Sequence, residues 1–572
     1  MTRRTLSLCL LPLCAALLCL CACAETSGPY TYTLREDGSA VFTGLDRFVQ
    51  LDPAIGTDDF VIPSELDGHP VTEIGAMQNV FFNKEYRVTV PDGVKVIGED
   101  AFSQLPRLTG VTLPGSVTVI GARAFSGCTA LTDLVIPDGV TCIGEQAFAL
   151  CRLTRADIPD SVTVLGDNAF LSCSSLTAVT IGAGLTGVGA NPFALCGLTE
   201  ITVSPANPRL TVTDGVLFDR EEKKLVCFPA GSERTEYEIP EGTQRLGADA
   251  FAGCRLASVS VPDSVAAMEG NPFYACLPLA EVRLSPSHPA FFTADGALID
   301  RAEKRLVFCP FGRTAFTVPD GVERIGERAF ALNFDLTSVT LPDSVTHIGG
   351  SAFASCFLER INLPDGLTEI GDAAFRGCNL RAAAFPGSLK RIGVSAFAGN
   401  PLAEVIIPDS VTEIGDEAFR DCRALTRVVI GDGVTRIGDR AFQVMNMMPN
   451  QDALAGVTFG KGLLSVGAGA FYGRAALTSV RLPEGLLSIG DEAFCSCFGL
   501  SDLTLPDTLT SIGHWAFSGC RSLTALTVPA GVTGIGEDAF RGCSRSLTLT
   551  VTRGSFAEAY CAEHGIPYDL AE

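Results

Sequence analysis

One phenylalanine, preceded by Ala or Pro, recurs along most of this 572-residue chain at a nearly fixed spacing. Most steps between successive copies are 22 or 23 residues. A single repeat of this length cannot bury its own apolar side, whereas stacked repeats share a continuous core, so the period predicts a solenoid. The anchor phenylalanines are Phe102, Phe125, Phe148, Phe170, Phe193, Phe251, Phe273, Phe330, Phe353, Phe375, Phe397, Phe419, Phe442, Phe471, Phe494, Phe517 and Phe540.

The repeat is seen most clearly in LTSVTLPDSVTHIGGSAFASC, from Leu336 to Cys356. Val339 and Leu341 are two residues apart, which predicts a short strand with one buried face. The sequence Pro342–Ser344 favours a turn, because Pro fixes φ and Asp and Ser bond back to their own backbone. A second extended segment is expected over 345–348, and residues 351–356 are expected to form one helical turn.

Two steps are long, from Phe193 to Phe251 and from Phe273 to Phe330, and they are copies of each other. Residues 214–219 match residues 295–300 at an offset of 81, and Asn-Pro-Phe replaces the usual Ala-Phe before each long step. We interpret both as β-hairpins that continue or decorate the coil.

The pattern IPDSVTEIGDEAF, followed by Cys and a new LT-x-V, resembles the BspA-type leucine-rich repeats of bacterial surface proteins. The resemblance covers nearly all of the chain after its leader. It implies a mainly β repeat solenoid, a rod of 22–23-residue coils, and family members commonly begin with a β-hairpin cap at the N-terminus. The residues at the other end predict a small helix and strand as the C-terminal cap. The family is associated with adhesion and with binding of host or neighbouring-cell proteins, and it has no common catalytic residues.

The ends of the chain carry signals of their own. A hairpin is expected with its turn at Asp37–Gly38, and a helix over 555–564, with Ser555 as N-cap and Gly565 as its end, followed by an edge strand at 566–568. The predicted organisation is a signal peptide (1–24), an N-terminal β cap (25–70), repeats (71–193), a repeat with a hairpin insertion (194–250), a repeat (251–273), a second repeat with a hairpin insertion (274–329), repeats (330–546) and a C-terminal cap (547–572).

The first 24 residues have the pattern of a leader that directs export. Arg3-Arg4 precedes an apolar run over 6–21, and Ala22–Ala24 is typical of a cleavage site. We favour cleavage after Ala24. The alternative is a lipobox at residues 20–23, which would make Cys23 a lipid-attachment site. An uncleaved anchor is less favoured because the run is short for a spanning helix, and no transmembrane helix is expected later in the chain.

The net charge of −23, with a pI of about 4.7, excludes several classes of partner. Nucleic-acid binders need a basic footprint, and attraction to anionic lipid needs one too. Neither partner is expected for this protein.

Seventeen cysteines follow the leader, an odd number that cannot pair completely within one chain. A row of thiols could hold soft metals or cross-link coils, but we favour Cys as a small apolar residue at an inward corner. Repeats that lack this Cys carry Asn333, Asn400 or Met445, which does not suggest another metal ligand. The only close cysteine pair, Cys495-x-Cys497, is a weak signal for a metal site. Twelve cysteines stand three residues after an anchor and form the cysteine ladder: Cys128, Cys151, Cys173, Cys196, Cys254, Cys276, Cys356, Cys378, Cys422, Cys497, Cys520 and Cys543.

No other residues form a catalytic, cofactor or metal motif. Asp214 and Asp219 flank a Gly, but two carboxylates are far short of a calcium shell, and turn chemistry is the simpler interpretation. The five histidines (His69, His288, His347, His514 and His564) share no repeat phase. Acids recur after Ile-Gly and predict a solvated edge, with a cation-binding strip as the alternative (Glu99, Asp100, Glu145, Asp416 and Glu417).

The remaining signal is the row of outward strand positions, which is broad, varied and mostly uncharged. We predict an exported, non-catalytic protein that acts in extracellular macromolecular binding or adhesion at the cell surface, with a protein partner favoured over a glycan. The alternative is a structural cell-envelope protein without a specific partner, and the oligomeric state stays open. The outward positions are Thr112, Val135, Asp157, Thr180, Ser260, Arg283, Thr340, Asn362, Ile406, Arg481, Thr504 and Thr527.

Overall fold

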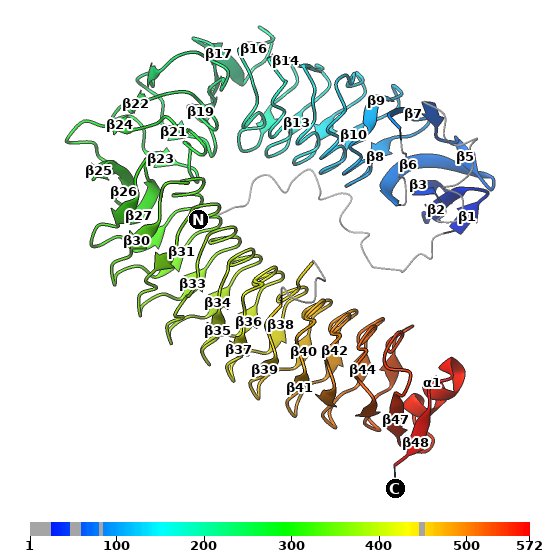
Figure 1. Ribbon diagram of the computed structural model, residues 1–572. Coiled ribbons are helices and arrows are strands. Elements are labelled where there is room, and N and C mark those ends of the chain that lie inside the picture. Colours follow the sequence, from blue (N-terminus) through cyan, green and yellow to red (C-terminus); the bar gives the residue numbers. More distant parts are fainter. Residues whose placement is uncertain (1–24, 46–58, 79–83, 446–451, 572) are drawn as a thin grey trace. The chain divides into compact units, whose positions relative to one another are not determined.

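The computed structural model describes residues 25–45, 59–78, 84–445 and 452–571, so the predicted signal peptide and Cys23 lie outside the described residues. The chain divides into two compact units, Met1–Ala290 and Phe291–Glu572 (Figure 1). A continuous apolar core runs from Tyr32 to Cys227 in the first unit and from Ala297 to Cys561 in the second. No helix in the described part of the chain has the length and hydropathy needed to cross a bilayer.

An antiparallel hairpin closes the N-terminal end of the first unit. β2 (Tyr30–Leu34) pairs with β3 (Ala40–Leu45) around a turn in which Asp37 accepts a hydrogen bond from the Ser39 amide at 2.9 Å. Gly38 adopts a φ of 78°, which glycine reaches without steric cost. β3 then pairs in parallel with β6 (His69–Gln78), which also pairs with β5 (Glu65–Leu66). The predicted β-hairpin cap is therefore confirmed.

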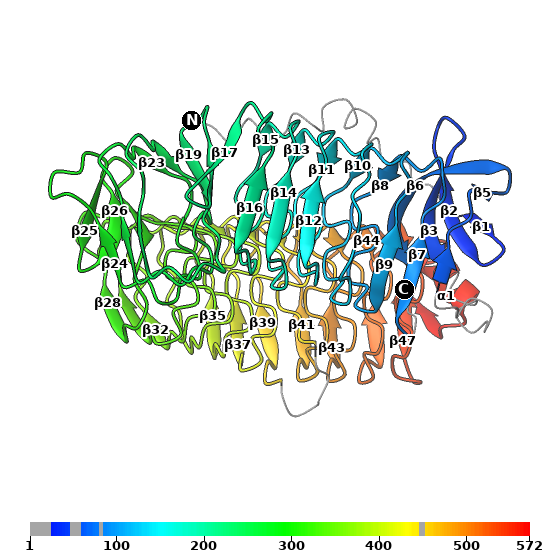
Figure 2. The ribbon, with the colours of Figure 1, turned by 90° about the horizontal axis from the view of Figure 1, so that it is seen from above.

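Most coils contribute two short strands, separated by a turn, to two different parallel sheets. Residues 130–136 form only an isolated bridge in place of the first strand, and residues 380–386 form no strand. The second strands continue the sheet of the hairpin cap through β8 (Val96–Ile97), β10 (Val119–Ile120), β11 (Cys142–Ile143), β13 (Val164–Leu165) and β15 (Gly187–Val188). At the other edge of this sheet, β1 (Glu25–Ser27) pairs with β2. The first strands form β4 (Asp59–Val61), β7 (Tyr86–Thr89) and β9 (Leu108–Thr112), and then β12 (Arg155–Ile158), β14 (Ala178–Ile181) and β16 (Glu200–Val203), which lie side by side in Figure 2.

The two long steps hold hairpins that continue the coil. In the first, β17 (Leu210–Thr213), β18 (Val216–Asp219) and β19 (Lys224–Cys227) are antiparallel, and β19 then pairs in parallel with β21 (Arg245–Leu246), which precedes β23 (Ala267–Met268). The Phe228 amide donates to the Ala250 carbonyl at 2.8 Å and its ring stacks on Phe251, so Phe228 is an anchor that the Ala-Phe pattern does not reveal. The first strands here are β20 (Glu236–Glu238), β22 (Ser258–Ser260) and β24 (Glu281–Arg283).

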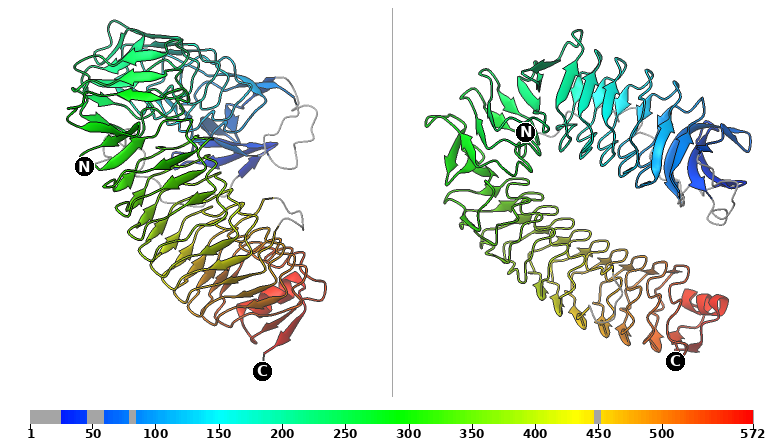
Figure 3. Two further views of the ribbon diagram at one scale, coloured as in Figure 1. Left: turned by 60° about the vertical axis from the view of Figure 1, so that its left-hand side comes forward. Right: turned by 45° about the horizontal axis from the view of Figure 1, so that its top comes forward.

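The second unit repeats this arrangement over a longer stack (Figure 3). Its hairpin is β25 (Phe291–Ala294), β26 (Ala297–Asp300) and β27 (Arg305–Phe308). A parallel sheet follows through β29 (Arg324–Ile325), β31 (His347–Ile348), β33 (Glu369–Ile370), β34 (Arg391–Ile392), β36 (Glu413–Ile414), β38 (Arg436–Ile437), β40 (Ser465–Val466), β42 (Ser488–Ile489), β44 (Ser511–Ile512) and β46 (Gly534–Ile535). The first strands are β28 (Ala315–Thr317), β30 (Ser338–Thr340), β32 (Arg360–Ile361), β35 (Glu404–Ile406), β37 (Arg427–Val429), β39 (Gly456–Thr458), β41 (Ser479–Arg481) and β43 (Asp502–Thr504).

The anchor rings stack along the core. In the second unit, consecutive centroids lie between 4.8 Å (Phe330 and Phe353) and 5.7 Å (Phe517 and Phe540) apart. In the same unit, each anchor amide from Phe330 to Phe517 also donates to the carbonyl of the Ala before the next anchor. This bond is kept across the longer step from Phe442 to Phe471, where the Phe442 amide reaches the Ala470 carbonyl at 2.7 Å. Stacked rings and a backbone ladder therefore join each coil to the next.

The helical turn predicted at residues 351–356 is wrong. Ser351 and Ser355 have positive φ values of 52° and 58°, which interrupts any helix. Successive backbone amides instead alternate between acceptors in their own coil and acceptors in the next coil. The Ala354 amide donates to the Ser351 carbonyl of its own coil, whereas the Phe353 amide donates to the Ala374 carbonyl of the next coil. Because half of the amides serve the neighbouring coil, a helix cannot form.

The C-terminal cap consists of α1 (Phe556–His564) and β48 (Tyr568–Leu570), which pairs with β47 (Thr548–Val551), the neighbour of β45 (Ala525–Thr527). Ser555 caps the helix through the Glu558 amide and Gly565 ends it in the left-handed region, as the sequence indicates. The strand begins at Tyr568 and not at Ile566. Tyr560 of α1 accepts a hydrogen bond from Ala539 and donates one to Gly536, so it satisfies the last coil's backbone groups.

Candidate functional site

The cysteine ladder holds adjacent coils together. All twelve Sγ atoms lie within hydrogen-bond distance of a backbone carbonyl of the preceding coil, such as Cys128 with Phe102 at 3.0 Å and Cys356 with Phe330 at 3.0 Å. All 17 cysteines among the described residues are free thiols. Burial raises the pKa of Cys128 and of Cys356 to about 12, so these thiols are poor nucleophiles.

Where Cys is absent, three copies use another side-chain donor at the same position, whereas Leu105 and Met445 have no such donor. Asn333 donates to Pro310 at 3.2 Å, and Asn400 donates to Phe375 at 2.7 Å. Arg474 is fully buried at this position and its Nε donates to Phe442 at 2.6 Å. Its Nη1 also binds the buried Asp452 at 3.0 Å and the Cys422 carbonyl at 3.2 Å. Most copies therefore place a donor to the preceding coil's carbonyl at the ladder position, and the Ala-Phe pattern alone does not reveal that Arg474 serves this purpose.

Asp214 and Asp219 are both occupied by protein partners. Asp214 accepts two hydrogen bonds from Arg234, at 2.7 and 2.8 Å. The buried Asp219 accepts the amides of Glu221 and Glu222 and pairs with Arg209 at 2.6 Å. These contacts account for both carboxylates as turn and ion-pair chemistry.

The histidines and the acids after Ile-Gly are dispersed. Within the described ranges, no three His, Cys, Asp or Glu side chains gather in a group that could hold a metal ion. The five histidines each hydrogen-bond locally: His69 to Gly38, His288 to Pro262, His347 to Thr346, His514 to Glu537 and His564 to Tyr560. Most of the acids pair with arginines or amides: Glu99 and Asp100 with Arg123, Asp416 with Arg436 and Glu417 with Arg420, while Glu145 accepts from Gln146.

The outward positions of the first strands face solvent. Val135 is 75% exposed and Ile406 is 46% exposed, and Thr180 and Ser260 are half-buried. Asn362 departs from the row because its side chain donates to the Leu341 carbonyl at 2.8 Å and accepts from the Leu341 amide at 2.9 Å. It therefore replaces the backbone pairing that β32 lacks after Ile361.

A second exposed surface lies along the second strands of the second unit, which the sequence reasoning did not single out. The first residue of each strand from β29 to β38 is charged or His, in the order Arg324, His347, Glu369, Arg391, Glu413 and Arg436. Arg391 pairs with Glu369 at 3.1 Å, and Arg436 pairs with Glu413 at 3.0 Å. Burial and the charge of Arg324 lower the pKa of His347, which leaves it neutral near pH 7.

The charges stop at β40. From there the first residues are Ser465, Ser488, Ser511 and Gly534, and the residues before them are Leu464, Leu487, Thr510 and Thr533. Many other coils have a polar Thr at the position of Leu464 and Leu487. These two leucines are nevertheless 44% and 46% exposed. We name these eight residues the neutral face. Because protein interfaces are depleted of charge at their centre, this face is the best candidate for a contact surface.

Comparisons with known proteins agree with the repeat. The model of the BspA type leucine rich repeat region matches residues 90–212, 226–292, 323–448 and 448–558. A leucine-rich repeat protein from Bacteroides ovatus is 23% identical, with 96% of this chain and all of that chain covered and a TM-score of 0.33. A leucine rich cell surface protein from Faecalibacterium prausnitzii is 28% identical, with 76% and 94% covered and a TM-score of 0.30. The pneumococcal vaccine antigen PcpA is 14% identical, with 96% and 99% covered and a TM-score of 0.29. The search of curated proteins found no match. Since the family model matches well over half of its residues, the chain belongs to the BspA type leucine-rich repeat family.

Proposed function

We propose that the protein is exported and binds an extracellular protein as a surface adhesion or interaction protein, without turning over a substrate. The observation that carries the proposal is the neutral face, a run of four parallel strands whose outward residues carry no charge in a protein of net charge −23. The leader sequence and the family's surface members support export.

The neutral face has the composition of an interface centre. Leu464 and Leu487 stand on adjacent coils and offer apolar side chains to a partner, and serines line the strands beside them. Apolar contacts at the centre of an interface contribute most of its binding energy, whereas rim charges mainly affect the association rate. The acidic remainder of the protein favours a partner with a basic rim.

The proposal is tested by measuring binding of the purified protein to extracellular matrix proteins, to surface proteins of neighbouring cells and to glycans. The double variant L464D/L487D buries two carboxylates in any complex formed on the neutral face, so its affinity is expected to fall by at least tenfold. The matched control T412D/T435D places the same carboxylates at the same repeat position before β36 and β38, and its affinity should stay within twofold.

Binding that is saturable and lost only in L464D/L487D supports the proposal. Equal affinity in both double variants would place the contact elsewhere, and no saturable binding to any partner would favour the alternative, a structural envelope protein. Raising the salt concentration should slow association without a comparable change in dissociation.

A further inference from the structure

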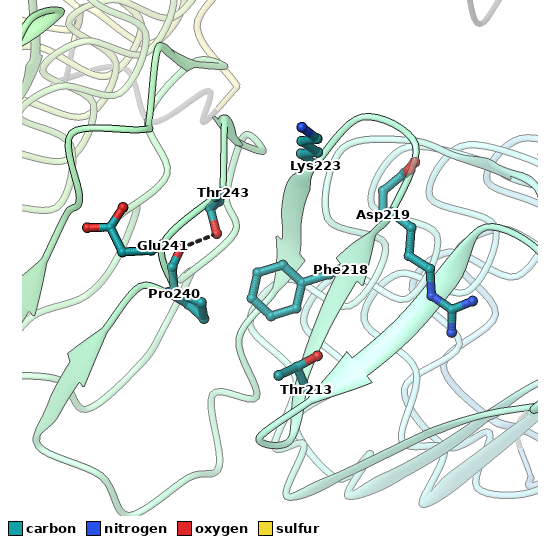
Figure 4. Close-up of a pocket in the computed structure, with 9 residues that line it drawn as sticks. Thr213, Phe218, Asp219, Lys223, Pro240, Glu241 and Thr243 are labelled. Carbon is teal, nitrogen blue, oxygen red and sulfur yellow. Dashed lines mark hydrogen bonds between the residues drawn. The ribbon is translucent and has the colours of Figure 1, made fainter.

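A pocket of about 300 Å³ lies in the first unit, between the first inserted hairpin and the loop after β20 (Figure 4). The Phe218 ring projects from β18 toward Pro240 across the opening. The hairpin contributes the other side chains that matter here, which are Thr213, Arg220 and Lys223. The pocket therefore combines an aromatic face, a hydroxyl and two cations.

The second hairpin is a natural control, because it repeats the scaffold and changes the lining. At the offset of 81 residues, Lys223 corresponds to Lys304, whose Nζ lies 2.5 Å from a carboxylate oxygen of Glu323. The amide of Glu323 donates to Lys304 just as the amide of Gln244 donates to Lys223, so Gln244 stands where Glu323 does. Lys223 therefore lacks the acidic partner that Lys304 has, and it forms no ion pair with the residues that the structure describes.

The second cation shows the same contrast. Arg220 corresponds to Arg301, whose guanidinium lies 4.7 Å from the centroid of the Phe292 ring. Thr211 replaces Phe292 in the first hairpin, so Arg220 lacks the counterpart of the ring that Arg301 covers. The lining differs too, since Ile299 in the second hairpin replaces Phe218.

The acids near the pocket do not neutralise these cations. Asp219 is buried and already paired with Arg209, and the Glu241 side chain points away from the Phe218 ring (Figure 4). Two cations without an ion pair among the described residues, beside a half-buried ring in a protein of net charge −23, mark a site for an anion that also has an apolar face.

We propose that this pocket binds an acidic sugar, a six-membered sugar ring that carries a carboxylate, as found in uronic acids and sialic acids. The partly positive C–H groups of the sugar lie on the negative face of the Phe218 ring, with Pro240 on the opposite side. The carboxylate receives a charge-assisted hydrogen bond from Lys223, and the Thr213 hydroxyl bonds a ring hydroxyl. The volume suits one sugar residue of a longer glycan, and the site is independent of the neutral face.

Ligand-observed saturation-transfer NMR titrations of the purified protein test this proposal, with glucuronate and N-acetylneuraminate as the two acidic probes and glucose as the neutral match of glucuronate. We expect saturable binding of at least one acidic probe in the millimolar range, at least tenfold tighter than that of glucose. F218A should weaken binding by tenfold or more, and K223Q should reduce it to the level of glucose. K304Q in the second hairpin is the matched control and should bind as the wild type does.

F218L keeps the apolar contacts and removes the aromatic face, so it replaces F218A if that variant does not fold. Equal binding of glucose and glucuronate, no binding of either acid, or unchanged binding in K223Q or in F218L would each overturn the proposal. Binding of glucuronate alone or of N-acetylneuraminate alone would identify the source of the carboxylate.

Discussion

The buried guanidinium of Arg474 offers the sharpest test of how neighbouring coils are held together. The variant R474M keeps a similar volume but removes the partner of Asp452, whose side chain is 3% exposed. It also leaves the Phe442 and Cys422 carbonyls without their donor. Breaking a buried ion pair on one side costs about 3–5 kcal/mol, because the remaining charge is stranded away from water.

Trp515 allows this cost to be measured locally. It is the only tryptophan in the chain and stands two coils beyond Arg474. In a solenoid the stability of each coil depends on its neighbours, so Trp515 fluorescence in a urea titration reports the unfolding of this region. With a slope of about 2 kcal/mol per molar urea, the loss lowers the transition midpoint by about 1.5–2.5 M.

The double variant R474C/D452A separates the ion pair from the ladder. It restores the residue that most coils carry at this position and removes the stranded carboxylate, so most of the lost stability should return. If R474M lowers the free energy of unfolding by less than about 1 kcal/mol, the reasoning is refuted. Such a small change would mean that the Asp452 carboxylate does not depend on the guanidinium for its stability. Failure of the double variant to recover would show that Arg474 contributes something besides the pair.

Three further expectations follow from the core, the thiols and the cap. Replacing Phe375, which is fully buried and stacks on Phe353 and Phe397, by Ala should lower the free energy of unfolding by about 3–5 kcal/mol in urea denaturation, and a loss below about 1 kcal/mol would contradict the stacked core. Stability should be retained below about pH 9 and fall between about pH 9 and 12, because the pKa of Cys356 rises from its ordinary value of 9.0 to about 12 on folding and the unfolded chain loses its protons first. C356N, which supplies the amide donor that other coils use, should lessen this loss in pH-dependent thermal melts, and a variant as alkali-sensitive as the wild type would argue against the thiol. S555A removes the helix N-cap and should destabilise the C-terminal cap by about 1 kcal/mol, measured by hydrogen exchange of α1 amides, with unchanged exchange as the contrary result.

The period of the sequence predicts most of the fold because each coil repeats the same physical requirement. Phe353 and Cys356 recur at fixed spacing since one fills the core and the other donates to the preceding coil, and both needs are visible as residue types. Phe228 does not match the Ala-Phe pattern, because the sequence at this point, directly after the inserted hairpin, is Cys-Phe-Pro. Its role depends on the amide bond to Ala250, which only the folded chain reveals.

The candidate surfaces were less predictable, because they depend on which neighbours a side chain meets. Lys223 and Lys304 look alike in sequence, and their difference lies in Gln244 and Glu323, some twenty residues away. Leu464 likewise appears as one more apolar residue until the structure shows that its side chain points to solvent. The residues that fill the core can be identified from the pattern of a single repeat. Which side chains are exposed, and which pair with each other, depends on how neighbouring repeats are aligned.

The backbone ladder between anchors has a consequence for how this protein changes length in evolution. The Phe442 amide meets the Ala470 carbonyl with the same geometry that joins coils separated by 22 residues, although extra residues intervene. The junctions between the coils from Phe330 onward are therefore alike, so an in-frame duplication or deletion of one of these coils leaves only junctions of the same kind. Each such event changes the length of the stack by about 5 Å, the spacing of neighbouring strands. Recombination can therefore change the number of coils one at a time, without compensating substitutions in the core.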